Sequence, residues 1–201
     1  DGDFQKQLDA VRKALDFAQI LEAPYIRIFS YFIPKGEDAA KHRGQVLDWL
    51  GKLIVEAEKT RIVLAHENES HIYGDIGDRC LDLFQSLKSP NFTGIFDFAN
   101  FVQNQQETYT QCWTRLKSHI TYFHIKDAVA ATGKVVPAGQ GDGQIPKILA
   151  EAYAAGYHNF LTLEPHLSLA EANFGRTTPA LFATATSALK GILAGIPAAR
   201  I

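Results

Sequence analysis

Short apolar segments that alternate with amphipathic helices are the feature that most constrains the fold of this chain. Stretches with apolar residues at three- and four-residue steps predict helices between these segments. Continuous apolar strands joined through helices indicate a parallel sheet covered by helices. The five segments that are typical of buried strands are YIRIFS (25–30), IVLAH (62–66), TGIFD (93–97), ITYFHI (120–125) and NFLTLE (159–164).

Five parallel strands fit either an open, doubly wound α/β sheet or part of a (β/α)₈ TIM barrel. A dinucleotide-binding sheet would carry GxGxxG after its first strand, and no such motif follows residue 30. No linker, repeat or change of composition divides the chain. We therefore expect residues 1–201 to form a single domain.

Composition excludes several classes of protein. The 201 residues are 46% hydrophobic and carry a formal net charge of -2, which is ordinary for a folded chain and argues against a nucleic-acid partner. No apolar run approaches the roughly 20 residues that a membrane span needs. Cys80 and Cys112 lie far apart in predicted helices, which favours reduced core thiols in a cytoplasmic protein over a disulfide framework.

Polar, metal-ligating side chains stand at the ends of four consecutive predicted strands. They are Glu67, Asp97, His124 and Glu164, separated by 30, 27 and 40 residues. A (β/α)₈ barrel uses about 31 residues per unit, and the carboxyl ends of its strands converge on one mouth, where active sites lie. We therefore expect the four side chains to meet there.

Three carboxylates and an imidazole in one place would repel each other unless a cation neutralised them. Singly, each residue has a simpler explanation, since an Asp at a strand end is often a helix N-cap and a buried His is often a core residue. The joint pattern favours a site for one divalent metal ion. Oxygen-rich ligation with one imidazole suits Mn²⁺, Mg²⁺ or Co²⁺, and Zn²⁺ also fits.

Four motifs surround these residues, in the order HENE (66–69), FDFAN (96–100), FHIKD (123–127) and LEPH (163–166). Together they resemble the xylose-isomerase-like TIM barrel superfamily, and within it the sugar phosphate isomerase/epimerase branch, similar to the ketohexose 3-epimerases. The resemblance covers roughly residues 8 to 195 and implies that Glu67, Asp97, His124 and Glu164 bind one metal. It makes YIRIFS the fourth of eight strands. About three strands, or roughly 70 to 90 residues, would then be absent, and we expect the natural protein to be longer.

The resemblance also implies a reaction. A metal-dependent isomerase or epimerase of this kind moves a proton next to the carbonyl of a sugar or sugar phosphate, through a metal-bound enediolate. Glu67 and Glu164 would be the catalytic acid/base pair, while Asp97 and His124 would only hold the metal. Relatives commonly form homodimers or homotetramers, and the substrate would be a small sugar or polyol derivative that the sequence does not name.

Further residues are candidates for substrate contact, each with a structural alternative. Lys126 would either reach substrate oxygens or form a salt bridge at the rim of the barrel, and Arg176 would either meet an anionic group or be solvated in its loop. The other candidates flank ligand positions and could equally have surface or supporting roles; they are Asn68, His71 and His166.

Two other features have simpler interpretations. Arg27 interrupts an apolar strand and needs an anionic partner, for which we favour an internal ion pair over a substrate group. GQGDG (139–143) precedes a helix and could bind an anion, although a Gly-rich turn there is usually only a turn.

Three alternatives remain open. A metal-dependent dehydratase of the inosose or dehydroshikimate type would begin with the same proton abstraction. An apurinic endonuclease-like metal hydrolase needs a His where Asn100 stands and an Asp-x-His pair before the last strand, and no His lies between residues 127 and 158. A non-catalytic sugar-binding domain could retain the same fold.

Overall fold

A computed structural model describes residues 2–167, 177–197 and 199 of the chain. Its main feature is a sheet in which five strands lie in the order β1-β2-β3-β4-β7, every neighbouring pair being parallel. The chain is thus an α/β partial TIM barrel, as predicted. The strands are β1 (Tyr25–Ile28), β2 (Val63–Glu67), β3 (Phe92–Asp97), β4 (Ile120–Ile125) and β7 (Leu161–Leu163).

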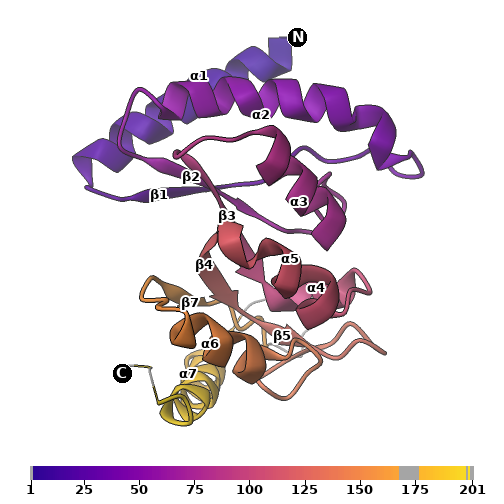
Figure 1. The fold of residues 1–201 in the computed structure, drawn as a ribbon, viewed down its shortest axis with the longest axis vertical. Coiled ribbons are helices and arrows are strands. Elements are labelled where there is room, and N and C mark those ends of the chain that lie inside the picture. Colours follow the sequence, from indigo (N-terminus) through magenta and orange to yellow (C-terminus); the bar gives the residue numbers. More distant parts are fainter. Residues whose placement is uncertain (1, 168–176, 198, 200–201) are drawn as a thin grey trace.

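Helices connect these strands and cover the outer face of the sheet (Figure 1). α1 and α2 lie together beside β1 and β2, while α6 and α7 lie beside β7 at the opposite end. The longer helices are α1 (Gly2–Ile20), α2 (Arg43–Ala57), α3 (Gly77–Ser86), α6 (Ile145–Ala154) and α7 (Pro179–Ala194). The short ones are η1 (Ala39–His42), α4 (Phe98–Gln103), η2 (Thr108–Trp113), α5 (Thr114–Leu116) and η3 (Lys117–His119).

The two faces of the sheet differ in chemistry because successive side chains of a strand point to opposite sides. Leu64, Phe96 and Phe123 are fully buried and belong to the main apolar core under the helices. The neighbouring positions in each strand therefore face the inside of the barrel. Glu67, Asp97 and His124 occupy such inward positions at the carboxyl ends of β2, β3 and β4.

Some local structure differs from the expectation. A two-stranded antiparallel ribbon, β5 (Asp127–Ala128) with β6 (Val135–Val136), follows β4 directly. Between β3 and β4, where the sequence predicts a helix, the chain is divided into α4, a π-helix, η2, and one short α-helical turn, α5. β1 hydrogen-bonds only to β2 in the described part of the chain, so Arg27 is half-exposed and not inside a fully buried strand.

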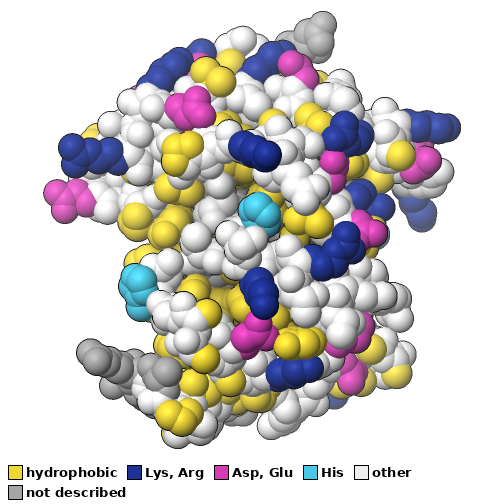
Figure 2. Space-filling model, in the orientation of Figure 1, with side chains coloured by type: hydrophobic (Ala, Val, Ile, Leu, Met, Phe, Trp, Pro, Cys, Tyr) yellow, Lys and Arg dark blue, Asp and Glu magenta, His cyan; other side chains and the backbone are white. Residues whose placement is uncertain are grey.

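Charged side chains of both signs cover the visible surface. On the face that Figure 2 shows, basic and acidic side chains are interspersed without a patch of one sign. Among the described helices none is long and apolar enough to cross a membrane. Cys80 and Cys112 are both free and buried, in α3 and η2.

Candidate metal centre

Four strands bring the predicted ligands to one place at the mouth of the partial barrel. Glu67 and Asp97 end β2 and β3, His124 lies one residue before the end of β4, and Glu164 directly follows β7. The register pairs Asp97 with His124 across the sheet, and the backbone N–H of Glu164 donates to the carbonyl of Ile125. One ligand atom from each of the four residues lies within 4.8 Å of the others.

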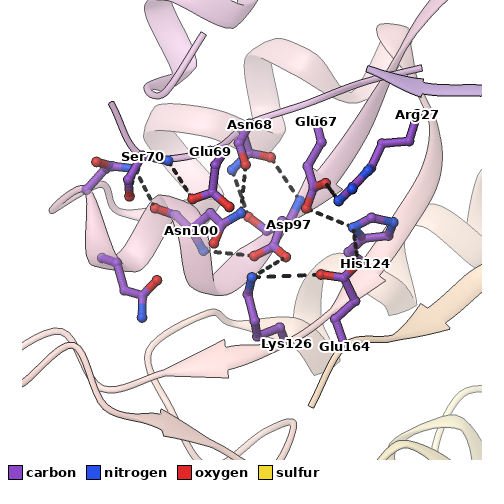
Figure 3. Close-up of polar contacts among 12 residues, drawn as sticks. Arg27, Glu67, Asn68, Glu69, Ser70, Asp97, Asn100, His124, Lys126 and Glu164 are labelled. Carbon is purple, nitrogen blue, oxygen red and sulfur yellow. Dashed lines mark hydrogen bonds and ion pairs between the residues drawn. The ribbon is translucent and has the colours of Figure 1, made fainter. Parts of the chain in front are cut away.

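His124 lies between the two glutamates (Figure 3). Its Nδ1 atom is 2.8 Å from Glu67 Oε1 and 3.3 Å from Glu164 Oε1. Glu67 is only 1% exposed, whereas 25% of the Glu164 side chain is exposed. The two glutamates thus share an imidazole contact but differ in their access to solvent.

Two basic side chains neutralise part of the negative charge. Lys126 Nζ lies 3.1 Å from Asp97 Oδ2 and 4.0 Å from Glu164 Oε2. Arg27 Nη1 donates to Glu67 Oε2 at 2.9 Å, which confirms the ion pair that the lone charge in YIRIFS predicted. Its partner, Glu67, was not predicted, because sequence spacing does not show which inward residues of neighbouring strands meet.

The ionisable groups shift each other's pKa. Burial raises the pKa of Asp97 to about 7, although Lys126 opposes this shift. Burial also raises the pKa of Glu67, but the hydrogen bond and charge of His124, together with Arg27, outweigh it and the pKa is lowered. For His124 burial favours the neutral ring, yet the surrounding carboxylates raise its pKa.

The donor set fits a divalent metal ion. Asp97 Oδ2 is buried and has no hydrogen-bond partner, and its contact with Lys126 is an ion pair only. The other Asp97 oxygen, Oδ1, accepts the Asn100 backbone N–H at 2.8 Å and caps α4. Asp97 is therefore both the helix cap that its position suggested and an inward-facing acidic side chain available to a metal ion. Three carboxylates with one imidazole are suitable ligands for Mg²⁺, Mn²⁺, Co²⁺ or Zn²⁺.

Two asparagines hold Asp97 in position. The Asn68 amide donates to the Asp97 carbonyl and accepts the Asp97 N–H, each at 2.9 Å. Asn100 Nδ2 donates to the Asn68 carbonyl at 2.8 Å. These bonds use the acceptor and one donor of its amide, so Asn68 supports the backbone of Asp97, and a substrate contact through its remaining N–H stays a prediction.

The other predicted substrate contacts are loop residues or lie outside the described residues. His71 is exposed, at a φ of 68°, and lines a cavity of about 360 Å³ with Lys35, Asp75 and Arg79. His166 is exposed at the end of the segment after β7, and its pKa is lowered by partial burial and by the charge of Lys126. Arg176 lies outside the described residues. Lys126, another predicted contact, lies directly against the carboxylates of Asp97 and Glu164.

The Gly-rich loop binds an anion of the chain itself. Asp127, which is fully buried, accepts backbone N–H groups from Gly139, Gly141 and Gly143 at 2.8 to 3.0 Å. A Cβ at Gly141 or Gly143 would lie within 2.7 Å of Asp127 Oδ1, so the close approach requires glycine there. The anion that GQGDG (139–143) binds is thus a carboxylate of the chain itself, and not an external ligand.

Comparison with known proteins agrees with this geometry. The family model described as "Xylose isomerase-like TIM barrel" matches residues 1–181. The chain belongs to this family. No curated protein matches the sequence.

Solved structures share the fold of this family member at low sequence identity. A D-tagatose 3-epimerase-like protein matches with a TM-score of 0.75 and 16% identity, over 96% of this chain and 70% of its own. The probable 3-DHS dehydratase AsbF from Bacillus anthracis matches with a TM-score of 0.73 and 16% identity, over 93% of this chain and 70% of its own. The IOLI protein, with a bound zinc atom, matches with a TM-score of 0.76 and 13% identity, over 98% of this chain and 72% of its own. The chain spans only 66% of another matched structure.

Proposed function

We propose that this chain carries the metal site of a sugar or sugar phosphate isomerase or epimerase. In this proposal Glu67, Asp97, His124 and Glu164 hold one divalent metal ion, and Glu67 and Glu164 also move the substrate proton. Similarity of fold to a D-tagatose 3-epimerase-like protein supports the reaction class.

The observation that carries the proposal is the arrangement of the two glutamates. They come from distant strands and reach His124 from different sides, with one oxygen of each within 3.3 Å of Nδ1 (Figure 3). Two carboxylates on different sides of a substrate can remove a proton from one face of a carbon and return one to the other. A single carboxylate would return the proton to the face it came from.

The environments of Glu164, Glu67 and Lys126 indicate a different role for each. A quarter of the Glu164 side chain is exposed, so a substrate carbon can approach its carboxylate. Burial would raise the pKa of Glu67, but His124 and Arg27 lower it, so in this proposal Glu67 begins the reaction as a carboxylate. Lys126, between Asp97 and Glu164, can donate a hydrogen bond to a substrate oxygen that gains negative charge. A divalent metal held by the four ligands would supply the Lewis acidity that polarises the carbonyl and acidifies the adjacent C–H.

Substitution of Glu164 tests the proposal. Glu164→Gln keeps the size of the side chain but removes its basicity, so kcat on a ketose or ketose phosphate should decrease about 10²- to 10⁴-fold. Solvent deuterium should enter the substrate with the wild-type protein and not with the variant. Glu151→Gln, in α6 away from the mouth, is the matched control and should retain activity.

The same experiment separates the reaction classes. Incorporation of deuterium with inversion at one carbon supports epimerisation, whereas loss of water from an inosose or dehydroshikimate supports a dehydratase. Full activity of Glu164→Gln on any substrate that the wild type converts would contradict the assigned acid/base role.

A further inference from the structure

Arg27 has features that the proposed acid/base and metal roles do not explain. It lies on β1, where its register partner is Ala65, so it stands two positions from Glu67 on the inward face of the adjacent strand. Its Nη1 atom donates to Glu67 Oε2 at 2.9 Å. The guanidinium also lies 4.7 Å from the ring centroid of Phe29, a cation–π contact that restrains it further.

The contact divides the two oxygens of Glu67 between different partners. Oε2 is bound by Arg27, while Oε1 lies 2.8 Å from His124 Nδ1 and faces the other ligands. A carboxylate held in this way cannot rotate without losing the charge-assisted bond, and it presents one oxygen to the centre of the site. Glu164 has a looser counterpart, since Lys126 is 4.0 Å from its second oxygen.

We infer that Arg27 is a positioning residue that holds Glu67 as a one-oxygen ligand of the metal site. The inference rests on the proposed function, because it assigns Arg27 a role at that same site. Partners that orient a metal ligand from outside typically contribute 10- to 100-fold to metal affinity. The stacked Phe29, the guanidinium and the buried carboxylate together form a continuous support that extends from β1 to the site.

A second ion pair in the same chain provides a matched control. Arg12 Nη2 lies 2.7 Å from Glu56 Oε1, and 46% of the Arg12 side chain is exposed, against 47% for Arg27. The Arg12 pair joins α1 to α2 and is remote from the four ligands. Loss of Arg12 therefore removes a similar arginine–carboxylate pair without touching the site.

Mn²⁺ binding by wild type, Arg27→Met, Arg27→Lys and Arg12→Met tests the inference. We expect wild type and Arg12→Met to bind about one Mn²⁺ per chain with equal Kd by isothermal titration calorimetry. Arg27→Met should bind about 10- to 100-fold more weakly, and Arg27→Lys, which retains a charged donor, should recover part of the loss. The electron paramagnetic resonance spectrum of bound Mn²⁺ should also change in Arg27→Met, because the coordination of Glu67 changes.

Each other result is decisive. Equal Kd values and equal Mn²⁺ spectra for Arg27→Met and wild type would overturn the positioning role. This also holds if the KM for an anionic substrate rises in Arg27→Met while Mn²⁺ binding is unchanged. An equal loss in Arg12→Met would overturn it too, since the effect would then be general. Wild type that binds no Mn²⁺ would contradict the proposed function itself and the inference with it. If circular dichroism shows that Arg27→Met is unfolded, Arg27→Lys decides by the same Kd comparison.

Discussion

At the scale of single residues, Asp97 shows how one side chain serves both the fold and the site. Its Oδ1 atom caps α4, while Oδ2 is buried next to Lys126 without a hydrogen bond. Complete burial makes the charged form costly, which is why the pKa rises to about 7 despite the neighbouring cation. A metal ion would replace a proton at this oxygen, so metal and proton compete for the same carboxylate.

This competition predicts a pH-dependent metal affinity. Below pH 7 Asp97 is mostly protonated in the metal-free protein and must lose a proton to bind a metal ion, whereas above pH 7 it is already ionised. Asp97 alone should therefore make the Kd for Mn²⁺ about tenfold higher at pH 6 than at pH 8, and His124, whose pKa is also raised, adds to the effect. Calorimetry in buffers of different ionisation enthalpy measures both the Kd and the protons released. An affinity that is constant between pH 6 and 8 would contradict this account.

At the scale of elements, the sequence predicted regular structure better than connections. The five strands, and the four acidic and imidazole side chains that meet at their ends, followed from apolar runs and from a repeated spacing, which are local signals. The β5–β6 ribbon, the pairing of Arg27 with Glu67 and the capture of the Gly-rich loop by Asp127 depend on which segments meet in space. Asn68 illustrates this difference. Its position next to Glu67 in the sequence suggested that it lines the pocket, whereas its amide hydrogen-bonds to the backbone of Asp97 in the structure.

The Asp127 loop gives a prediction about stability at this scale. Asp127→Asn keeps the shape of the side chain but replaces one acceptor oxygen by an NH₂ group, which leaves buried backbone N–H groups without an acceptor. Each lost bond to a charged group is worth about 1.5–3 kcal/mol, so the free energy of unfolding should decrease by about 3 kcal/mol or more. Urea denaturation measures it. Asp142→Asn, which affects one exposed bond to the Ala130 N–H, should cost less than about 1 kcal/mol, and equal losses would refute the argument.

At the scale of the whole molecule, the ligands join distant parts of one sheet. Glu67, Asp97 and His124 come from β2, β3 and β4, and Glu164 follows β7, nearly 100 residues after Glu67. The sheet continues beyond the site to β1, which contributes Arg27. A metal ion bound here would therefore link four strands in the native state and would have no comparable site in the unfolded chain.

Metal binding should for this reason stabilise the fold. A ligand that binds only the native state at 100 times its Kd adds about 2.7 kcal/mol, which for a chain of this length raises the Tm by roughly 5–10 °C. We expect this increase in differential scanning calorimetry when Mn²⁺ is added to metal-free protein, and its loss on addition of EDTA. Asp97→Asn, which retains the side-chain shape and an acceptor for the α4 cap but lacks the anionic ligand, should show little or no increase. A Tm that none of Mn²⁺, Mg²⁺, Co²⁺ and Zn²⁺ raises would mean that Arg27 and Lys126 alone neutralise this acidic group.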